Sequence, residues 1–309
     1  MAFMTLQIMA WNATHQPARI NFIHIPKAGG ASVIEGLSRL GLLSEVPKGQ
    51  PKNREMCFTL GYDPSAFTIV FFRSPRDHVR SQFLECKYDV QGIRERNTAF
   101  PLHFNDSYGF ELWVKHFTGA SKRLKASRGQ LPLENVCYNP TSMQARQMAS
   151  PCKESPHHRY YPSTKASLSS ALQNLKRVSF VGILEVFAAS WCLMLHQLKH
   201  AQPGFCFDST KEITLFHETH GIPREIETKK KVWEEVDILT SLDRTLYRAA
   251  LLRFLADFHQ HQSTSEHPFH SSLLDLSSLN RHVSYYMSMD LNSTTDLEIV
   301  LTHLESDHH

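Results

Sequence analysis

The residues with the clearest chemical use begin with a glycine-containing loop, P-K-A-G-G-A-S, from Pro26 to Ser32. An apolar run, Ile20 to Ile25, precedes the loop and has the length and composition of a buried strand. Apolar residues at helical spacing follow it, beginning at Val33. A strand, a glycine turn and a helix N-terminus direct several backbone N–H groups to one point, where they attract phosphate. Lys27 adds a positive charge at this turn.

Lys27 precedes the glycine pair, whereas the lysine of the nucleotide-triphosphate loop G-x-x-x-x-G-K-[ST] follows its glycines. On these residues alone, the alternative is an ordinary strand-to-helix turn with a solvated lysine, since such glycine turns are common.

A second stretch with chemical potential follows another apolar run, Phe67 to Phe72. Arg73 closes the run, and Ser81 lies eight residues later, within a predicted helix from Arg76 to Tyr88. A guanidinium offers a two-pronged donor and a serine offers a hydroxyl, so the two side chains together suit a phosphate group.

Both stretches resemble motifs of sulfotransferases that use 3′-phosphoadenosine-5′-phosphosulfate (PAPS). The first is similar to their 5′-phosphosulfate loop, and the second to R-[DN]-P-x-x-R-x-x-S, which holds the 3′-phosphate; His78 stands where that motif has its second arginine. The resemblance implies that Lys27 stabilises the leaving oxygen. The cofactor-binding residues that it implies are Pro26, Lys27, Ala28, Gly29, Gly30, Ala31, Ser32, Arg73 and Ser81. The loop's usual threonines are replaced by Ala28 and Ala31, which leaves the backbone cradle intact.

Two looser matches extend the resemblance toward the heparan sulfate 2-O type of carbohydrate sulfotransferase. The segment Val181 to Phe187 is similar to V-G-x-x-E-x-[FL], and Ser142 to Gln147 is similar to a Gln-x-Arg segment. We expect Glu185 to be structural. For Gln144 and Arg146, a surface helix and a contact with cofactor or acceptor are equal alternatives.

The general base is unassigned. In the 2-O type a histidine precedes the 3′-phosphate motif, but no histidine lies between His24 and His78 here, and His24 is expected in the core. The nearby carboxylates, Glu55, Asp63 and Glu85, are weak candidates. The chemistry that the resemblance implies requires no metal.

The expected function is therefore sulfuryl transfer from PAPS to a hydroxyl acceptor, most simply a carbohydrate. A catalytically silent member that binds nucleotide or glycan is the first alternative, and a P-loop small-molecule kinase is the second. The formal net charge of +3 over 309 residues is mild and does not favour nucleic acid as a partner. The carbohydrate branch and three glycosylation sequons, at Asn12, Asn105 and Asn292, favour the Golgi over the cytoplasm.

The elements alternate in type, which predicts an α/β fold with a P-loop-type central parallel sheet, flanked by helices on both faces. We expect an N-terminal segment (1–18), a sulfotransferase-like domain (19–258) and a loosely attached polar tail (259–309). The apolar residues 1–11 are too short to span a bilayer, so any membrane anchor lies outside this chain. Further strands are predicted at Met56–Leu60 and Val178–Leu184. Further helices are predicted at Tyr108–Phe117, Thr141–Ala149, Ser163–Leu175 (capped by Ser163), Glu185–Lys199 and Ser241–Phe258.

Six cysteines form no C-x-x-C pair, which argues against zinc and thioredoxin-type chemistry. Cys192 lies in an apolar helical run and is predicted to be a buried free thiol. Cys137 and Cys152 flank a short segment and are the pair that we expect to close a loop if oxidised. The remaining pairings are not fixed by the sequence.

Overall fold

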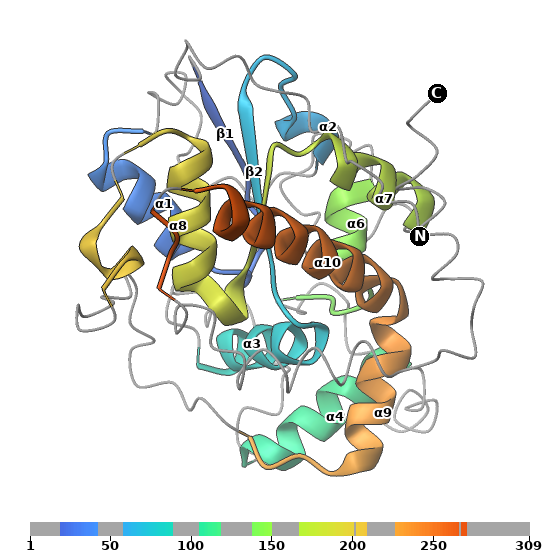
Figure 1. Cartoon of the computed structure of the whole chain (residues 1–309). Coiled ribbons are helices and arrows are strands. Elements are labelled where there is room, and N and C mark those ends of the chain that lie inside the picture. The colour runs from blue at the N-terminus through green and yellow to red at the C-terminus, as the bar shows by residue number, and fades with distance from the viewer. Residues whose placement is uncertain are drawn as a thin grey trace, which may run out of the picture.

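A parallel sheet lies at the centre of the chain in the computed structural model (Figure 1). The structure describes residues 19–42, 58–88, 105–118, 138–149, 167–200, 202–208, 226–265 and 267–270. Within these ranges the sheet has three strands in the order β1-β2-β3: β1 Ile20–Ile23, β2 Phe67–Phe72 and β3 Phe180–Ile183. All pairs are parallel, with Ile20 opposite Phe67 and Phe71 opposite Gly182. The predicted α/β class with a parallel sheet is confirmed.

The strands form where apolar residues run together. All six residues of β2 are buried, as is typical of the middle strand of a parallel sheet. Gly182 lets the large Phe71 side chain fit between the strands, because a Cβ at Gly182 would lie 2.5 Å from the Phe71 ring. The phenylalanine-rich strand β2 therefore depends on a small residue in its neighbour.

Helices follow β1, β2 and β3 directly, as predicted. The bounds are α1 Gly30–Arg39, α3 Pro75–Tyr88, the short η3 Leu184–Val186 and α8 Phe187–Gln197. The other elements are α2 Phe58–Gly61, α4 Asp106–Thr118, α6 Met143–Ala149, α7 Leu168–Arg177, η4 Gly204–Cys206, α9 Lys230–Leu239 and α10 Ser241–Thr264. The sequence did not predict α9, which begins with two lysines.

Two local predictions were wrong. The segment Phe58–Gly61 is a helical turn and not a strand, because the Phe58 and Tyr62 rings, four residues apart, stack with centroids 4.7 Å apart. The cap of α7 is Ser167 and not Ser163: its hydroxyl accepts the Ser170 N–H at 3.3 Å, and the helix begins at Leu168. Ser163 itself lies outside the described residues.

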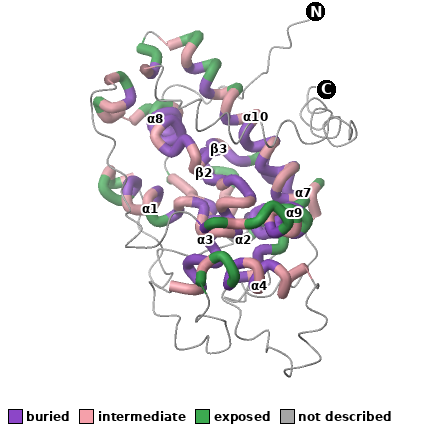
Figure 2. The backbone as a smooth tube through the Cα atoms, turned by 90° about the horizontal axis from the view of Figure 1, so that it is seen from below, coloured by how far each residue is buried: buried purple, intermediate pink, exposed green. Residues whose placement is uncertain are grey.

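Buried apolar side chains form two clusters. Figure 2 shows which stretches of the backbone are buried. The larger one joins the sheet to α1, α8 and α10. The smaller one joins α3, α4 and α9, through residues such as Phe83, Phe110, Trp113 and Val236. The helix α3 follows β2 and contributes to the smaller cluster, so it connects the sheet to the pair α4 and α9, which lie side by side (Figure 1).

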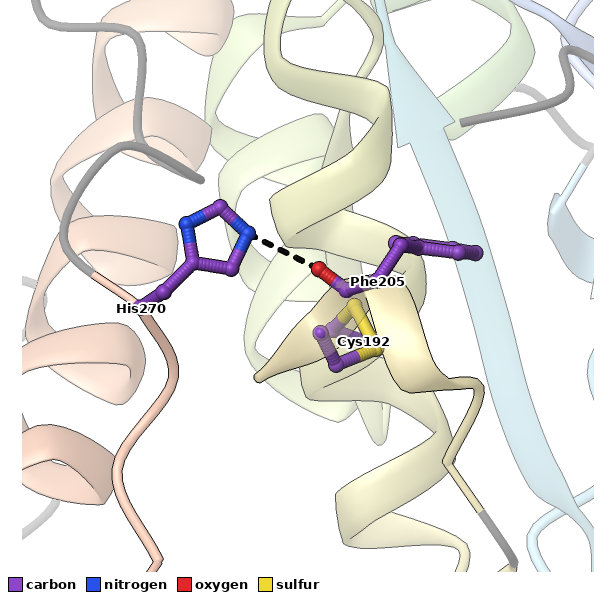
Figure 3. The surroundings of a disulfide bond; sticks show 4 residues. Cys192, Phe205 and His270 are labelled. Atoms are coloured by element: carbon purple, nitrogen blue, oxygen red, sulfur yellow. Dashed lines mark hydrogen bonds between the residues drawn. A yellow bond between two sulfur atoms is a disulfide. The ribbon is translucent and has the colours of Figure 1, made fainter. Parts of the chain in front are cut away.

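The start of the expected tail is well packed. Residues 259–264 belong to α10, and the Phe269 side chain is buried. The His270 Nε2 atom lies 2.8 Å from the Phe205 carbonyl, and the His270 N–H donates to the Cys206 carbonyl at 3.2 Å (Figure 3). Loose attachment is therefore the wrong description for these residues; positions 271–309 lie outside the described ranges.

Cys192 is not a free thiol. It forms a disulfide with Cys206, which ties α8 to η4 (Figure 3). The sequence could not reveal this pair, since pairing among several cysteines is not deducible from spacing. Cys137 and Cys152 lie outside the described residues, and Cys86 is buried and not in a disulfide. Among the described helices, none has the length and apolar character to cross a membrane.

We expect the Cys192–Cys206 disulfide to stabilise the fold. It closes a loop with a sequence separation of 14, and a loop of this size corresponds to about 3 kcal/mol in the chain-entropy account. A reducing agent should lower the unfolding free energy by an amount of this order, measured by denaturant unfolding. The control is the double variant Cys192→Ala/Cys206→Ala, which should show no response to the reducing agent. An equal response in both proteins would contradict the expectation.

Candidate functional site

The loop between β1 and α1 has an unusual backbone. Lys27 has φ 62° and Gly29 has φ 84°, both in the left-handed region that residues other than glycine rarely adopt. Gly29 has a second reason to be glycine, because a Cβ there would lie 2.5 Å from the Leu184 side chain. Strained residues that are not glycine are concentrated at functional sites, and Lys27 is such a residue.

Gly30 begins α1 and packs directly on His24. A Cβ at Gly30 would lie 1.9 Å from the His24 ring, so only glycine allows this approach. Burial, and secondarily the charge of Lys27, lower the pKa of His24 to about 4. His24 is therefore a neutral residue packed beneath the loop, and its Nδ1 atom is buried without a hydrogen-bond partner among the described residues, so it is not the satisfied core histidine that we expected. The first N–H groups of α1, from Gly30 onward, have no acceptor within the helix.

The end of β2 is held by side chains from distant parts of the chain. The Gln144 amide accepts the Arg73 N–H at 3.0 Å and donates to the Arg73 carbonyl at 2.8 Å. Glu185 accepts the Ser74 N–H at 2.7 Å and the Tyr247 hydroxyl at 2.9 Å. Both polar groups of the Arg73 peptide region are thus satisfied by side chains, as buried backbone groups require.

The helix α6 that carries Gln144 is buried along its whole length and is not a surface helix. The Asp243 carboxylate accepts the N–H groups of Gln144 and Ala145, at 3.3 and 2.7 Å. Burial raises the pKa of Asp243 to about 7, although these N–H groups and Arg146 oppose the shift. Arg146 donates to the carbonyls of Asn139 and Thr141, both at 2.7 Å. Gln144 therefore positions Arg73 and contributes no free group of its own.

The two predicted motifs meet at the carboxyl ends of β1 and β2. The Arg73 Nη1 atom donates to the Lys27 carbonyl at 3.2 Å, across a sequence separation of 46. The His78 Nε2 atom lies 2.7 Å from the Pro26 carbonyl. Lys27 forms an ion pair with Glu85, with 2.7 Å between Nζ and Oε2. The adjacent parallel strands explain this meeting, because both strands end at the same edge of the sheet.

His78 is a neutral hydrogen-bonding residue at this meeting point. Its Nε2 carries the proton, since the Pro26 carbonyl can only accept, and its Nδ1 accepts from the Gln82 amide at 3.1 Å. Burial is the main cause that lowers the pKa of His78 to about 3; the charges of Arg73, Lys27 and Arg146 lower it further, against the opposing effect of the Pro26 hydrogen bond. Three cationic side chains therefore lie close enough to His78 to lower its pKa.

The arginines of α3 differ in their surroundings. Arg76 donates to both oxygens of Asp237, at 2.9 and 2.6 Å, and its guanidinium lies 5.5 Å from the centroid of the Trp233 ring. It joins α3 to α9 and is committed to that structural role. Arg80 forms an ion pair with Asp77 at 2.7 Å. Burial lowers the pKa of Arg73, and Arg80 contributes to this shift, so Arg80 acts on the Arg73 charge.

Ser81 lies on α3 and is half-buried. Within the described part of the chain, no hydrogen bond joins it to Arg73 or to the loop from Pro26 to Ser32. The structure therefore brings Arg73 to the loop but shows no direct contact for Ser81.

The three carboxylates proposed from the sequence have different positions. Asp63 accepts from the N–H and hydroxyl of Ser65, at 2.9 and 2.6 Å, which lowers its pKa; it also pairs with Arg19 at 3.1 Å. Asp63 and Arg19 precede their strands, so they lie at the edge of the sheet opposite to Lys27. Glu55 lies outside the described residues. Glu85 is the one of the three that the structure brings to the loop.

Sequence reasoning found the loop and Arg73 but missed the residues that support them. The spacing of four between His78 and Gln82 is a signal for a pair on one helix face. No feature of the sequence pointed to Tyr247 and Asp243, because both are distant in sequence from the residues that they contact. Among the described residues, no group of histidine, cysteine or acidic side chains has the arrangement of a metal site. A scan against models of protein families finds no match, and a search of curated proteins finds none either.

We expect the neutral, buried state of His78 to make the fold sensitive to acid. The unfolded chain takes up a proton at His78 below pH 6.5, whereas the folded protein does so only near pH 3. The unfolding free energy therefore decreases as the pH is lowered below 6.5. Protonation of His78 in the unfolded chain alone accounts for about 2 kcal/mol of this decrease between pH 6.5 and 5. Denaturant unfolding at both pH values measures it.

The matched variants are His78→Gln and His259→Gln. The first should be less stable at pH 7 but should show a weaker pH dependence. The second changes an exposed histidine and should retain the wild-type dependence. An unchanged pH dependence in His78→Gln would show that the buried imidazole does not resist protonation.

Proposed function

We propose that this chain is a PAPS-dependent sulfotransferase that transfers a sulfuryl group to a hydroxyl of a carbohydrate. The observation that carries the proposal is the contact between the two motifs, in which the Arg73 guanidinium reaches the Lys27 carbonyl at 3.2 Å. Two stretches that resemble the two ends of one cofactor site are distant in sequence and adjacent in space. The finer fold that we propose is a P-loop-type sheet with helices on both faces.

The residues around the loop suit an anionic nucleotide. Lys27, Arg73 and Arg146 all lower the pKa of His78, so their charges converge on one region. The left-handed Lys27 and Gly29 turn the chain sharply before α1 begins. Such a turn at a helix N-terminus directs N–H groups toward a phosphate or sulfate oxygen. These features fit the 5′-phosphosulfate group that the resemblance implies.

In the proposed mechanism, backbone N–H groups of residues 28–32 bind the 5′-phosphosulfate. Arg73 and Ser81 hold the 3′-phosphate. Lys27 stabilises the negative charge that develops on the leaving oxygen, the kind of charge stabilisation that contributes most to group transfer. The hydrogen bonds to His78 and Gln144 keep the loop and Arg73 in place. No step of this proposal uses a metal.

The oxidised Cys192–Cys206 pair supports a Golgi location, because structural disulfides persist in oxidising compartments. A location in the secretory pathway agrees with a carbohydrate acceptor. We propose that the segments 91–107 and 121–130 select the acceptor; apart from residues 105–107, both lie outside the described residues.

Two other functions compete with this proposal. A silent family member that binds nucleotide or glycan is favoured by the lack of a histidine between His24 and His78. A P-loop kinase is disfavoured because the lysine precedes the glycine pair. Binding of the cofactor product without transfer to any of a panel of glycans would favour the silent member.

The first test is ligand preference. We expect 3′-phosphoadenosine-5′-phosphate to raise the melting temperature more than ATP does, because the proposal assigns Arg73 to a 3′-phosphate, which ATP lacks. Arg73→Ala should weaken binding of this nucleotide at least tenfold by calorimetry, whereas Arg39→Ala, at an exposed position on α1, should bind normally. Preference for ATP would refute the proposal, and normal affinity in Arg73→Ala would count against the 3′-phosphate role.

The second test concerns the leaving group. Lys27→Ala should lose at least a hundredfold in transfer of labelled sulfuryl from PAPS, because the proposed mechanism assigns stabilisation of the leaving oxygen to the Lys27 ammonium. It should still bind 3′-phosphoadenosine-5′-phosphate, which reports that the site is folded. Lys230→Ala removes a lysine whose side chain is 93% exposed and is the control. Undiminished turnover in Lys27→Ala would refute the assigned role.

A further inference from the structure

We propose that Glu85 is the general base of the sulfuryl transfer, and that it stays in an ion pair with Lys27 until the cofactor binds. The inference rests on the proposed function and adds the missing residue of the acceptor side. Its basis is the ion pair between the Lys27 Nζ atom and the Glu85 Oε2 atom at 2.7 Å. The Glu85 side chain is only 6% exposed, so this charge is not an ordinary solvated carboxylate.

The other Glu85 oxygen, Oε1, has no hydrogen bond or ion pair with a described residue. Among the described residues, none other than Lys27 makes a hydrogen bond or ion pair with Glu85. Oε1 is also not a sealed, unsatisfied atom of the core. A carboxylate with one oxygen on the catalytic lysine and the other open has the arrangement that a proton acceptor needs.

The face of α3 that carries Glu85 is the face that meets the loop. His78, Gln82 and Glu85 follow at helical spacing, so they lie along one side of the helix. His78 contacts Pro26 and Glu85 contacts Lys27, the next residue of the loop. The His78 hydrogen bond therefore keeps the Glu85 carboxylate in register with Lys27.

Other acidic groups near the carboxyl ends of the strands are committed. Asp77 pairs with Arg80 and accepts the Ser74 hydroxyl. Glu185 accepts the Ser74 N–H and the Tyr247 hydroxyl, while Asp243 accepts two N–H groups of α6. Asp63 is at the opposite edge of the sheet.

The two nearby histidines are equally unsuited to act as bases. His78 donates from Nε2 and accepts at Nδ1, so it has no lone pair left for an acceptor hydroxyl. His24 is neutral and covered by Gly30. Among the described residues at this edge, Glu85 is therefore the group that combines proximity to Lys27 with an open proton-accepting atom.

The ion pair couples cofactor binding to base activation. When Lys27 turns to the bridging oxygen of the bound phosphosulfate, Glu85 loses its cationic partner. The Glu85 carboxylate is then no longer held in the ion pair and can accept a hydrogen bond from the acceptor hydroxyl. The base is thus silent while the site is empty and becomes effective when the sulfuryl group is in place.

The proposed step transfers one proton and one sulfuryl group. Glu85 Oε1 takes the proton of the acceptor hydroxyl while the hydroxyl oxygen forms a bond to sulfur. The bond between sulfur and the bridging oxygen breaks, and its electron pair remains on the 5′-phosphate oxygen beside the Lys27 ammonium. The products are a sulfate monoester, 3′-phosphoadenosine-5′-phosphate and a protonated Glu85, which then releases its proton to solvent.

The test uses Glu85→Gln in the full chain, with two measurements. The first is the affinity for 3′-phosphoadenosine-5′-phosphate by calorimetry. The second is release of labelled sulfuryl from PAPS, counted together in a panel of unsulfated glycosaminoglycans and in water, so that the acceptor need not be known. We expect the affinity to stay equal or rise, because a negative charge beside Lys27 is removed. We expect the transfer rate to fall about 10²- to 10⁴-fold, as for loss of a general base.

Equal or higher affinity together with a lower transfer rate distinguishes a general base from other roles of Glu85. Loss of affinity and rate together would mean that Glu85 only supports the fold, and an unchanged or increased rate would mean that it only restrains Lys27; either result overturns the inference. Glu85→Asp keeps the charge but withdraws the carboxylate, so it should keep affinity and lose at least tenfold in rate; full activity there also overturns it. Asp63→Asn is the matched control and should behave as wild type. Failure of the wild-type chain to bind 3′-phosphoadenosine-5′-phosphate would instead refute the proposed function.

Discussion

The hydrogen bond between the buried His78 imidazole and the Pro26 carbonyl joins the two strand–helix units on which the site depends. One partner lies in the loop after β1 and the other in the helix after β2. Because His78 is sealed from water, neither of its ring nitrogens has solvent as an alternative partner. The loop position, the path of Lys27 and the contact with Arg73 all follow from this fixed point. A neutral imidazole suits the position, since it adds no charge to a region that already holds several cations.

The end of β2 shows how a parallel sheet satisfies its last peptide groups. Beyond Phe72 no strand within the described ranges pairs with Arg73 and Ser74, and Gln144 and Glu185 supply the acceptors and donors. Asp243 in turn fixes the start of the helix that carries Gln144. Side chains from α6, η3 and α10 therefore converge on one turn. Such networks are stable when every member is satisfied, and they hold Arg73 rigidly because Gln144, Asp243 and Tyr247 are themselves buried.

The cationic side chains around the loop differ in their carboxylate partners. Lys27 has its own carboxylate, Glu85, whereas Arg76 is removed from the site by Asp237 and Trp233. A lysine that is paired in the empty site pays less to remain charged in a partly buried position. In the proposed mechanism the same pair is a switch, because an anionic ligand would replace the carboxylate as the partner of the lysine. Lys27 also has a left-handed backbone conformation, which is rare for residues other than glycine and is concentrated at functional sites.

The sequence by itself determined the local features of this protein. The apolar runs at Ile20, Phe67 and Phe180, the helices after them and the glycine turn are all consequences of local composition and periodicity, and the structure confirms them. Gly29 was predictable because a left-handed turn has few other solutions. Only the tertiary structure decided the Cys192–Cys206 pair, the removal of Arg76 from the site, and the meeting of Lys27 with Glu85. Local pattern cannot encode which distant side chain fills a contact, because that choice depends on how the helices pack around the sheet.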